Sequence, residues 1–247
     1  ASMFAAIAER YEQAAYLILA AIVFDMLDGT VAKLTNSVSE FGKQLDSLAD
    51  LVSFGVAPAI LIYMAYLHEE RIAGSAVGRT GAMFAIVFVM CGWLRLARFN
   101  VYQSKMRDSF VGLPIPAAGG TVATFVLFTR HFSMTVAFWI LGPLTLALAY
   151  LMVSNVRYPK DRLKSVVMAP RNAFRMLALF AVAIGIIHYG FTHSPAIVLF
   201  PLAAAYVLFG IAEDMVKRLH KKTAPDTPQP EEDGEPESLP RKTGESL

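Results

Sequence analysis

Residues 25–33 read Asp25-Met26-Leu27-Asp28-Gly29-Thr30-Val31-Ala32-Lys33, and the polar pattern continues with Gly42, Asp46 and Asp50. The four aspartates lie in or beside two apolar runs, 13–32 and 44–67, each long enough to cross a membrane. Four aspartates at the centres of membrane helices would cost about 10–14 kcal/mol, and less near the interface. The stretch therefore predicts two membrane helices whose carboxylates have partners that offset this cost.

The spacing of the aspartates indicates what those partners are. Asp25 and Asp28 are three residues apart, and Asp46 and Asp50 are four apart, so each pair projects from one face of its helix. Because the connection between the helices is short, we expect them to be antiparallel neighbours whose carboxylates converge near the cytoplasmic ends. Oxygen ligands favour Mg²⁺ or Mn²⁺, and the absence of a nearby His or Cys cluster argues against zinc.

Small residues beside the aspartates predict a pocket for a phosphate compound. Mg²⁺ held by carboxylates usually completes its shell with phosphate oxygens, so we expect a phosphate ester or diphosphate as substrate. Gly29 and Ala32 follow the first two aspartates, and Gly42 lies one turn before Asp46. A base or ribose can lie against bare backbone there, with Lys33 near the diphosphate. The alternative is that these small residues only allow close helix packing.

The composition is that of a membrane protein. Of 247 residues, 55% are hydrophobic and 17% charged, and the mean hydropathy is +0.49, whereas soluble domains carry about 25% charge. The single Cys91 excludes an internal disulfide. We predict an all-α, polytopic transmembrane helix bundle with about seven spans, at 13–32, 44–67, 80–99, 113–130, 134–154, 173–190 and 195–215.

The two ends of the chain differ from this bundle. Residues 1–8 are apolar but too short to cross a membrane, and we expect them to be the remnant of a further span. No basic segment followed by a cleavage site opens the chain, so insertion is expected to depend on the spans. Residues 1–222 are predicted to form the transmembrane domain and 223–247 a disordered cytoplasmic tail rich in Pro, Glu and Lys.

Basic residues predict the orientation. Sixteen lysines and arginines fall in one set of connections, among them those around 33–43, 95–107 and 157–175, and four fall in the alternate set. By the positive-inside rule the first set, and the aspartate ends of the helices with it, face the cytoplasm.

The pattern D-x2-D-G-x2-A-K-x8-G-x3-D-x3-D, from Asp25 to Asp50, resembles the signature of the CDP-alcohol phosphotransferase family, in which an arginine usually stands at the position of Lys33. A wider likeness, to the membrane-embedded phosphatidylserine synthases of that family, is carried by residues 52–59, 95–100 and 112–118.

The resemblance implies a helical bundle, often dimeric, in the inner membrane of a prokaryote, with a cytoplasmic site. It implies that the four aspartates bind two divalent ions, Mg²⁺ or Mn²⁺, and that Asp50 is also the general base. The implied substrates are CDP-diacylglycerol and L-serine, which give phosphatidylserine and CMP by direct attack. Membrane lipids are expected partners, and nucleic acid is not. The implied CDP-binding residues are Asp25, Gly29, Ala32, Lys33 and Gly42.

The acceptor site is expected near the end of the span at 80–99. Arg95 and Arg98 lie three apart on one helix face, and either can receive the serine carboxylate or a phosphate, with Asn100 nearby. The alternative is that these cations only anchor the helix end. Other acceptors within the family are glycerol 3-phosphate, inositol phosphate or choline, and a cation transporter is the alternative from another class.

Overall fold

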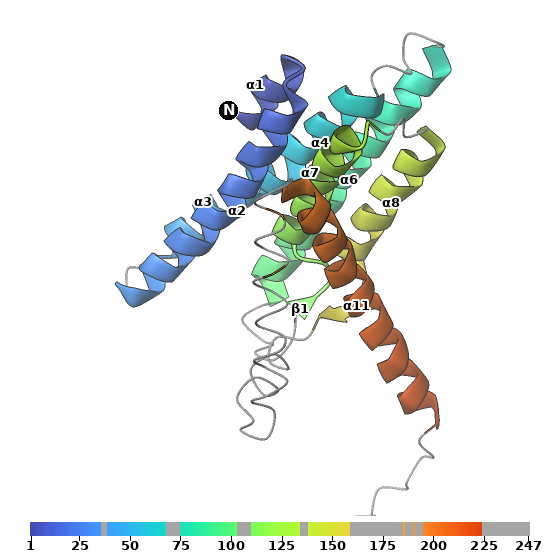
Figure 1. The fold of residues 1–247 in the computed structure, drawn as a ribbon. Coiled ribbons are helices and arrows are strands. Elements are labelled where there is room, and N and C mark those ends of the chain that lie inside the picture. The colour runs from blue at the N-terminus through green and yellow to red at the C-terminus, as the bar shows by residue number, and fades with distance from the viewer. Residues whose placement is uncertain are drawn as a thin grey trace, which may run out of the picture.

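The computed structural model describes residues 1–35, 39–67, 75–102, 110–133, 138–158, 185, 190 and 195–223 (Figure 1). The described helices and strands, in chain order, are α1 (Ser2–Ile7), α2 (Tyr11–Leu34), α3 (Glu40–Asp50), η1 (Leu51–Val56), α4 (Ala57–Ile62), η2 (Tyr63–Leu67), α6 (Ser75–Tyr102), β1 (Phe110–Val111), α7 (Ile115–His131), α8 (Phe138–Val153), β2 (Arg157–Tyr158) and α11 (Pro195–Thr223). The all-α prediction is confirmed, with one two-stranded pairing, β1 with β2, added to it in the part of the chain described.

Within the described ranges, four helical segments are long and apolar enough to cross a membrane, and the chain is an integral membrane protein. They are Tyr11–Ala32, Glu40–Tyr66, Thr80–Val101 and Pro195–Val216. The predicted spans 113–130 and 134–154 correspond to α7 and α8, which have 17 and 16 residues. The predicted span 173–190 lies almost wholly outside the described residues, so the count of seven stays a prediction. The predicted tail lies outside them too, except for Thr223 at the end of α11.

The second span is one continuous rod in which α-helical turns alternate with wider π-helical turns. Segment η1 begins directly after Asp50, and η2 follows α4. Pro58, near the start of α4, has no N–H to donate to the carbonyl four residues earlier, that of Phe54. α7 approaches closely at this point, because a Cβ added to Gly119 would lie 2.7 Å from the Phe54 carbonyl oxygen. Only a glycine on α7 allows the two backbones to come so near.

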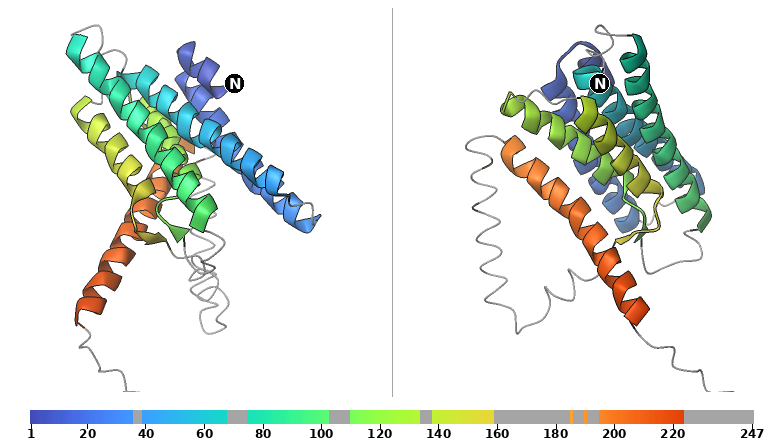
Figure 2. Two further views of the ribbon diagram at one scale, coloured as in Figure 1. Left: turned by 180° about the vertical axis from the view of Figure 1, so that it is seen from behind. Right: turned by 90° about the vertical axis from the view of Figure 1, so that its right-hand side faces the viewer.

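Helix α7 is the centre of the described core. Most of its side chains are buried, including Ile115, Val122 and Val126. It packs against α2, α4, α8 and α11 (Figure 2). By contrast, the C-terminal half of α2 and all of α3 extend together beyond the other helices (Figures 1 and 2), and most of their side chains are exposed. The four aspartates lie along this two-helix arm and at its junction with the bundle.

A short backbone latch of two hydrogen bonds joins the chain before α7 to the last turn of α8 and to the residues just after it. Gly112 donates its N–H to the Val156 carbonyl at 2.8 Å, and Leu113 donates to the Leu151 carbonyl at 3.0 Å. Gly112 has a φ of +85°, a left-handed conformation that favours glycine. A Cβ there would lie 2.4 Å from the Met152 carbonyl oxygen.

Replacing Gly112 by Ala is therefore expected to destabilise the fold by about 2–3 kcal/mol, since both the backbone conformation and the space oppose a methyl group. Thermal unfolding of the purified protein in detergent measures this as a lower Tm. A Gly112→Ala protein that unfolds at the wild-type temperature would contradict the latch as described.

Candidate active site

Three of the four predicted metal ligands meet between α2 and α3. One carboxylate oxygen from each of Asp25, Asp28 and Asp46 lies within 4.8 Å of the others. Oxygen ligands on opposite sides of one Mg²⁺ are about 4.2 Å apart, so small rotations of these side chains suffice for shared coordination. All ligand atoms are carboxylate oxygens, and this donor set fits a hard divalent cation.

Asp50 lies at the inner end of this cluster. Asp28 and Asp46 are exposed, whereas Asp25 and Asp50 are partly buried. Oδ1 of Asp50 is buried and has no hydrogen-bond partner among the residues that the structure describes. The charges of Asp25 and Asp46 both act on Asp50. The carboxylates therefore run from solvent into the protein, and the innermost one has a lone pair that no described donor uses.

The predicted CDP-binding residues have different surroundings. Around Gly29 nothing lies within 4 Å of where a Cβ would be, so this face of α2 borders open space. Ala32, one turn later, is partly buried. Gly42 belongs to the start of α3, where its N–H donates to the Ser39 hydroxyl at 3.0 Å, and a Cβ on Gly42 would touch that hydroxyl. The Lys33 side chain lies outside the described part of the chain.

Arg95 on α6 lies close enough to the carboxylates to interact with them. Its side chain is only 6% exposed, and its charge interacts with that of Asp50. Nε is buried and finds no hydrogen-bond partner within the described ranges. Cζ lies 5.8 Å from the centre of the Phe99 ring, which covers one side of the guanidinium. A buried cation with an unused donor next to a carboxylate cluster can receive an anionic group.

The other two predicted acceptor residues have partners within the protein. Arg98 donates from Nη1 to the Val153 carbonyl at 2.9 Å and from Nη2 to the Ser154 carbonyl at 3.1 Å. Asn100 donates from Nδ2 to the Ser47 hydroxyl on α3 at 3.2 Å. The structure thus brings Arg95 to the carboxylates, and it brings Arg98 to α8 and Asn100 to α3.

Two features of α11 were not predicted. Tyr206 interacts electrostatically with Arg95. α11, more than 100 residues further along the chain, thus lies close to Arg95. Glu213 and Asp214 are each only 8% exposed. The sequence signal for the acidic pair is two adjacent carboxylates near the end of an apolar run, whereas nothing local marks Tyr206.

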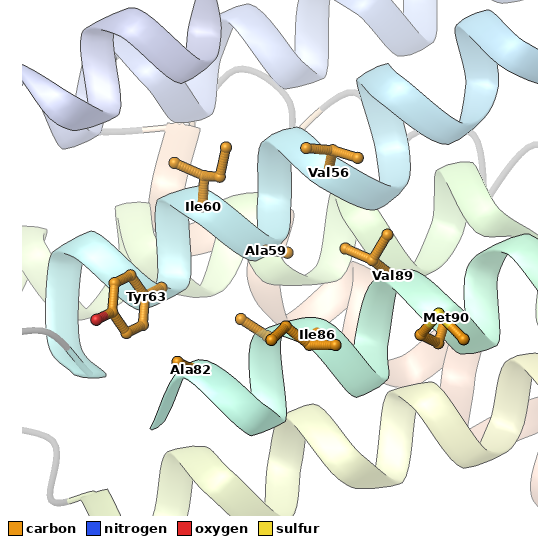
Figure 3. A pocket seen from close by; sticks show the side chains of 9 residues that line it. Val56, Ala59, Ile60, Tyr63, Ala82, Ile86, Val89 and Met90 are labelled. Atoms are coloured by element: carbon orange, nitrogen blue, oxygen red, sulfur yellow. The ribbon is translucent and has the colours of Figure 1, made fainter. Parts of the chain in front are cut away.

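A separate groove of about 340 Å³ lies between α6 and the rod of η1, α4 and η2. Figure 3 shows its apolar lining, from Val56 and Met90 at one end to Tyr63 and Ala82 at the other. It contains no carboxylate, cation or thiol. Because its lining carries no carboxylate, cation or thiol, the groove is a weaker candidate for catalysis than the carboxylate cluster.

Comparisons with known proteins match the region that contains this cluster. The model of the CDP-alcohol phosphatidyltransferase family matches residues 1–151. A CDP-diacylglycerol--serine O-phosphatidyltransferase of Methanocaldococcus jannaschii is 36% identical over 195 residues, which are 79% of this chain and 81% of that protein. One of Helicobacter pylori is 40% identical over 161 residues, 64% of this chain and 65% of the relative. An archaetidylserine synthase of Methanothermobacter thermautotrophicus is 42% identical over 149 residues, 60% of this chain and 58% of the relative. The matches thus span less than two thirds of the latter two relatives.

Proposed function

The chain belongs to the CDP-alcohol phosphatidyltransferase family, and from this premise we propose that it transfers the phosphatidyl group of CDP-diacylglycerol to the hydroxyl of L-serine, producing phosphatidylserine and CMP. The observation that carries the proposal is the convergence of Asp25, Asp28 and Asp46 beside the partly buried Asp50. Relatives from bacteria and archaea that are named as serine phosphatidyltransferases support serine as the acceptor.

The carboxylates of Asp25, Asp28, Asp46 and Asp50 would hold two divalent ions, Mg²⁺ or Mn²⁺. Bound ions would neutralise the diphosphate of the substrate and stabilise CMP as the leaving group. The exposure of Asp28 and Asp46 supports this assignment, because hydrated cations and a water-soluble headgroup can reach them from solvent. On α2, open space beside Gly29 supports a binding face for the cytidine nucleotide, formed with Asp25, Ala32 and Lys33, and Gly42 on the facing helix would complete it.

Asp50 would act as the general base. A serine hydroxyl has a pKa far above 7, so it needs a carboxylate that takes its proton as the new O–P bond forms. The serine oxygen attacks the phosphorus of the phosphatidyl group, the bond to the CMP oxygen breaks, and CMP leaves with the electron pair. The buried Oδ1 of Asp50, without a described partner, supports this role. The transfer is direct, with no covalent intermediate on the protein.

Arg95 would receive the carboxylate of serine, because Nε is the donor near Asp50 that no described residue uses. Replacing Arg95 by Met is expected to raise the KM for serine about 10- to 100-fold, as for loss of a charge-assisted hydrogen bond. The KM for CDP-diacylglycerol should change less than threefold. Steady-state kinetics in detergent micelles give both values.

Ethanolamine, a hydroxyl acceptor without a carboxylate, is the control for the Arg95 prediction. Its rate with the Arg95→Met protein should fall much less than the rate with serine. Equal losses with both acceptors would contradict carboxylate binding by Arg95 and would assign the residue to the support of Asp50.

We propose further that the site faces the cytoplasm from the inner membrane of a prokaryote. The concentration of lysine and arginine in the connections on the aspartate side supports this orientation. The homodimer implied by the sequence resemblance stays a prediction, and sedimentation of the protein in detergent would test it.

The proposed function is tested by CMP release from CDP-diacylglycerol by the purified protein in detergent. The acceptors to compare are L-serine, glycerol 3-phosphate, inositol phosphate and choline, each with and without Mn²⁺. The expected result is metal-dependent release with serine and none with the other three acceptors of this set. Release with another acceptor instead would change the acceptor within the family, and no release under any condition would favour a transport function.

A further inference from the structure

The C-terminal end of α6 carries two polar side chains that hold it to different neighbours. We infer that Arg98 and Asn100 are positioning residues, which hold this helix end between α8 and α3 and thereby fix the place of Arg95, one turn earlier on α6. This inference rests on the proposed function for the role of Arg95 and Asp50. Of the three polar residues at this helix end, Arg95 would bind the acceptor, whereas Arg98 and Asn100 would hold the helix.

Arg98 closes the C-terminal end of α8. The last four carbonyls of a helix have no partner within it, and cationic side chains often satisfy them. The guanidinium of Arg98 donates to the carbonyls of Val153 and Ser154 at 2.9 and 3.1 Å, and Nη1 also donates to Asn155 Oδ1 at 3.3 Å. A Cβ on Gly112 would lie 3.1 Å from Nη2. The guanidinium is thus directed to α8 and enclosed by the backbone of the latch.

Asn100 ties α6 to α3 at the position next to Asp46. Its Nδ2 donates to the Ser47 hydroxyl at 3.2 Å, and that hydroxyl donates to the Lys43 carbonyl at 3.0 Å. A side-chain hydrogen bond between helices far apart in sequence limits how α3 can rotate or slide against α6. Asp46 and Asp50 on the same helix are thereby held at a defined place relative to α6.

Arg95 lies one turn before Arg98 on α6, so any rotation or shift of the helix end moves it too. No described hydrogen bond holds the Arg95 Nε. Arg98 on one side and Asn100 on the other fix the backbone of this helix end, and with it the point from which the Arg95 side chain extends. Loss of either contact is expected to disturb catalysis with every acceptor, and not only the binding of serine.

Two variants of Arg98 distinguish positioning from direct binding of the serine carboxylate. Arg98→Lys keeps a cation that donates to the end of α8, so the serine KM should stay within about twofold of wild type. Arg98→Met should lower kcat about tenfold with serine and with ethanolamine alike, and it should lower the Tm. If Lys and Met both raise the serine KM more than tenfold while the ethanolamine rate is unchanged, Arg98 binds the carboxylate and the inference is wrong.

A double-mutant cycle tests the second contact. Ser47→Ala and Asn100→Ala should each lower kcat about fivefold, and the double variant should be no worse than either single variant, because all three lose the same bond. Thr35→Ala is the matched control, since the Thr35 hydroxyl, one residue after α2, donates to the Val31 carbonyl of that helix. Effects of Ser47 and Asn100 that multiply in the double variant would overturn the inference.

The Tm of these variants separates this inference from the proposed function. Arg98→Met and Asn100→Ala should unfold at lower temperature than wild type whether or not the protein makes phosphatidylserine. A wild-type protein without transferase activity would overturn the proposed function while the Tm values still report the contacts. Wild-type Tm values for both variants would overturn the positioning role itself.

Discussion

The Asp50→Asn protein is expected to bind CDP-diacylglycerol but to release CMP about 10²- to 10⁴-fold more slowly than wild type, with serine at saturation. That range is typical for loss of a general base. Asn has nearly the same shape as Asp but cannot take the hydroxyl proton. The partly buried position of Asp50 at the inner end of the cluster supports the proposed role.

Glu40→Gln is the matched control for Asp50→Asn. It makes the same carboxylate-to-amide change on the same helix, at an exposed residue that forms an ion pair with Lys43, one turn away. Exposed ion pairs contribute little to stability, so the Glu40→Gln protein should keep wild-type kcat. A comparable loss in both proteins would show that the effect comes from the charge of α3 in general, and would remove Asp50 from the role of base.

Replacing Asp28 by Asn is expected to raise the concentration of Mn²⁺ needed for half-maximal activity about tenfold or more. Asp28 is exposed and shares the cluster with Asp25 and Asp46, and loss of one charged ligand weakens a hard cation site. Because the other carboxylates remain, high Mn²⁺ should restore much of the rate. Asp50 is also a proposed ligand, so Asp50→Asn should weaken Mn²⁺ binding too. High Mn²⁺ should nevertheless fail to restore its rate, because the proposed general base is still missing.

Calorimetric titration of Mn²⁺ into the protein without substrate checks the Asp28 prediction independently of turnover. Wild type and Glu40→Gln should bind the ion with equal affinity, and Asp28→Asn should bind it more weakly. Equal affinity in all three proteins would contradict the assignment of the cluster as a cation site.

The carboxylate cluster was predictable because its geometry is local. Spacings of three and four residues place each pair of aspartates on one helix face, and the short connection makes the two helices neighbours. The structure brings Asp25, Asp28 and Asp46 together as the spacing predicts. The membrane helices are equally local, since length and hydropathy alone define a span such as Thr80–Val101.

The acceptor side was only partly predictable because its contacts join distant parts of the chain. Arg95 and Arg98 look alike in the sequence, yet Arg98 donates to carbonyls 55 and 56 residues away, while the charge of Arg95 interacts with that of Asp50. The bond between Ser47 and Asn100 spans 53 residues. Periodicity gives the face on which a residue lies, but it does not give the helix that packs there.

The most direct test of the account supplies the purified protein with CDP-diacylglycerol, Mn²⁺ and ¹³C-labelled L-serine and follows the lipid product by mass spectrometry. We expect labelled phosphatidylserine in equal amount to CMP, and formation of both products by the Asp50→Asn protein about 10²- to 10⁴-fold more slowly. CMP release without labelled lipid, or labelled lipid made at the wild-type rate by Asp50→Asn, would contradict it.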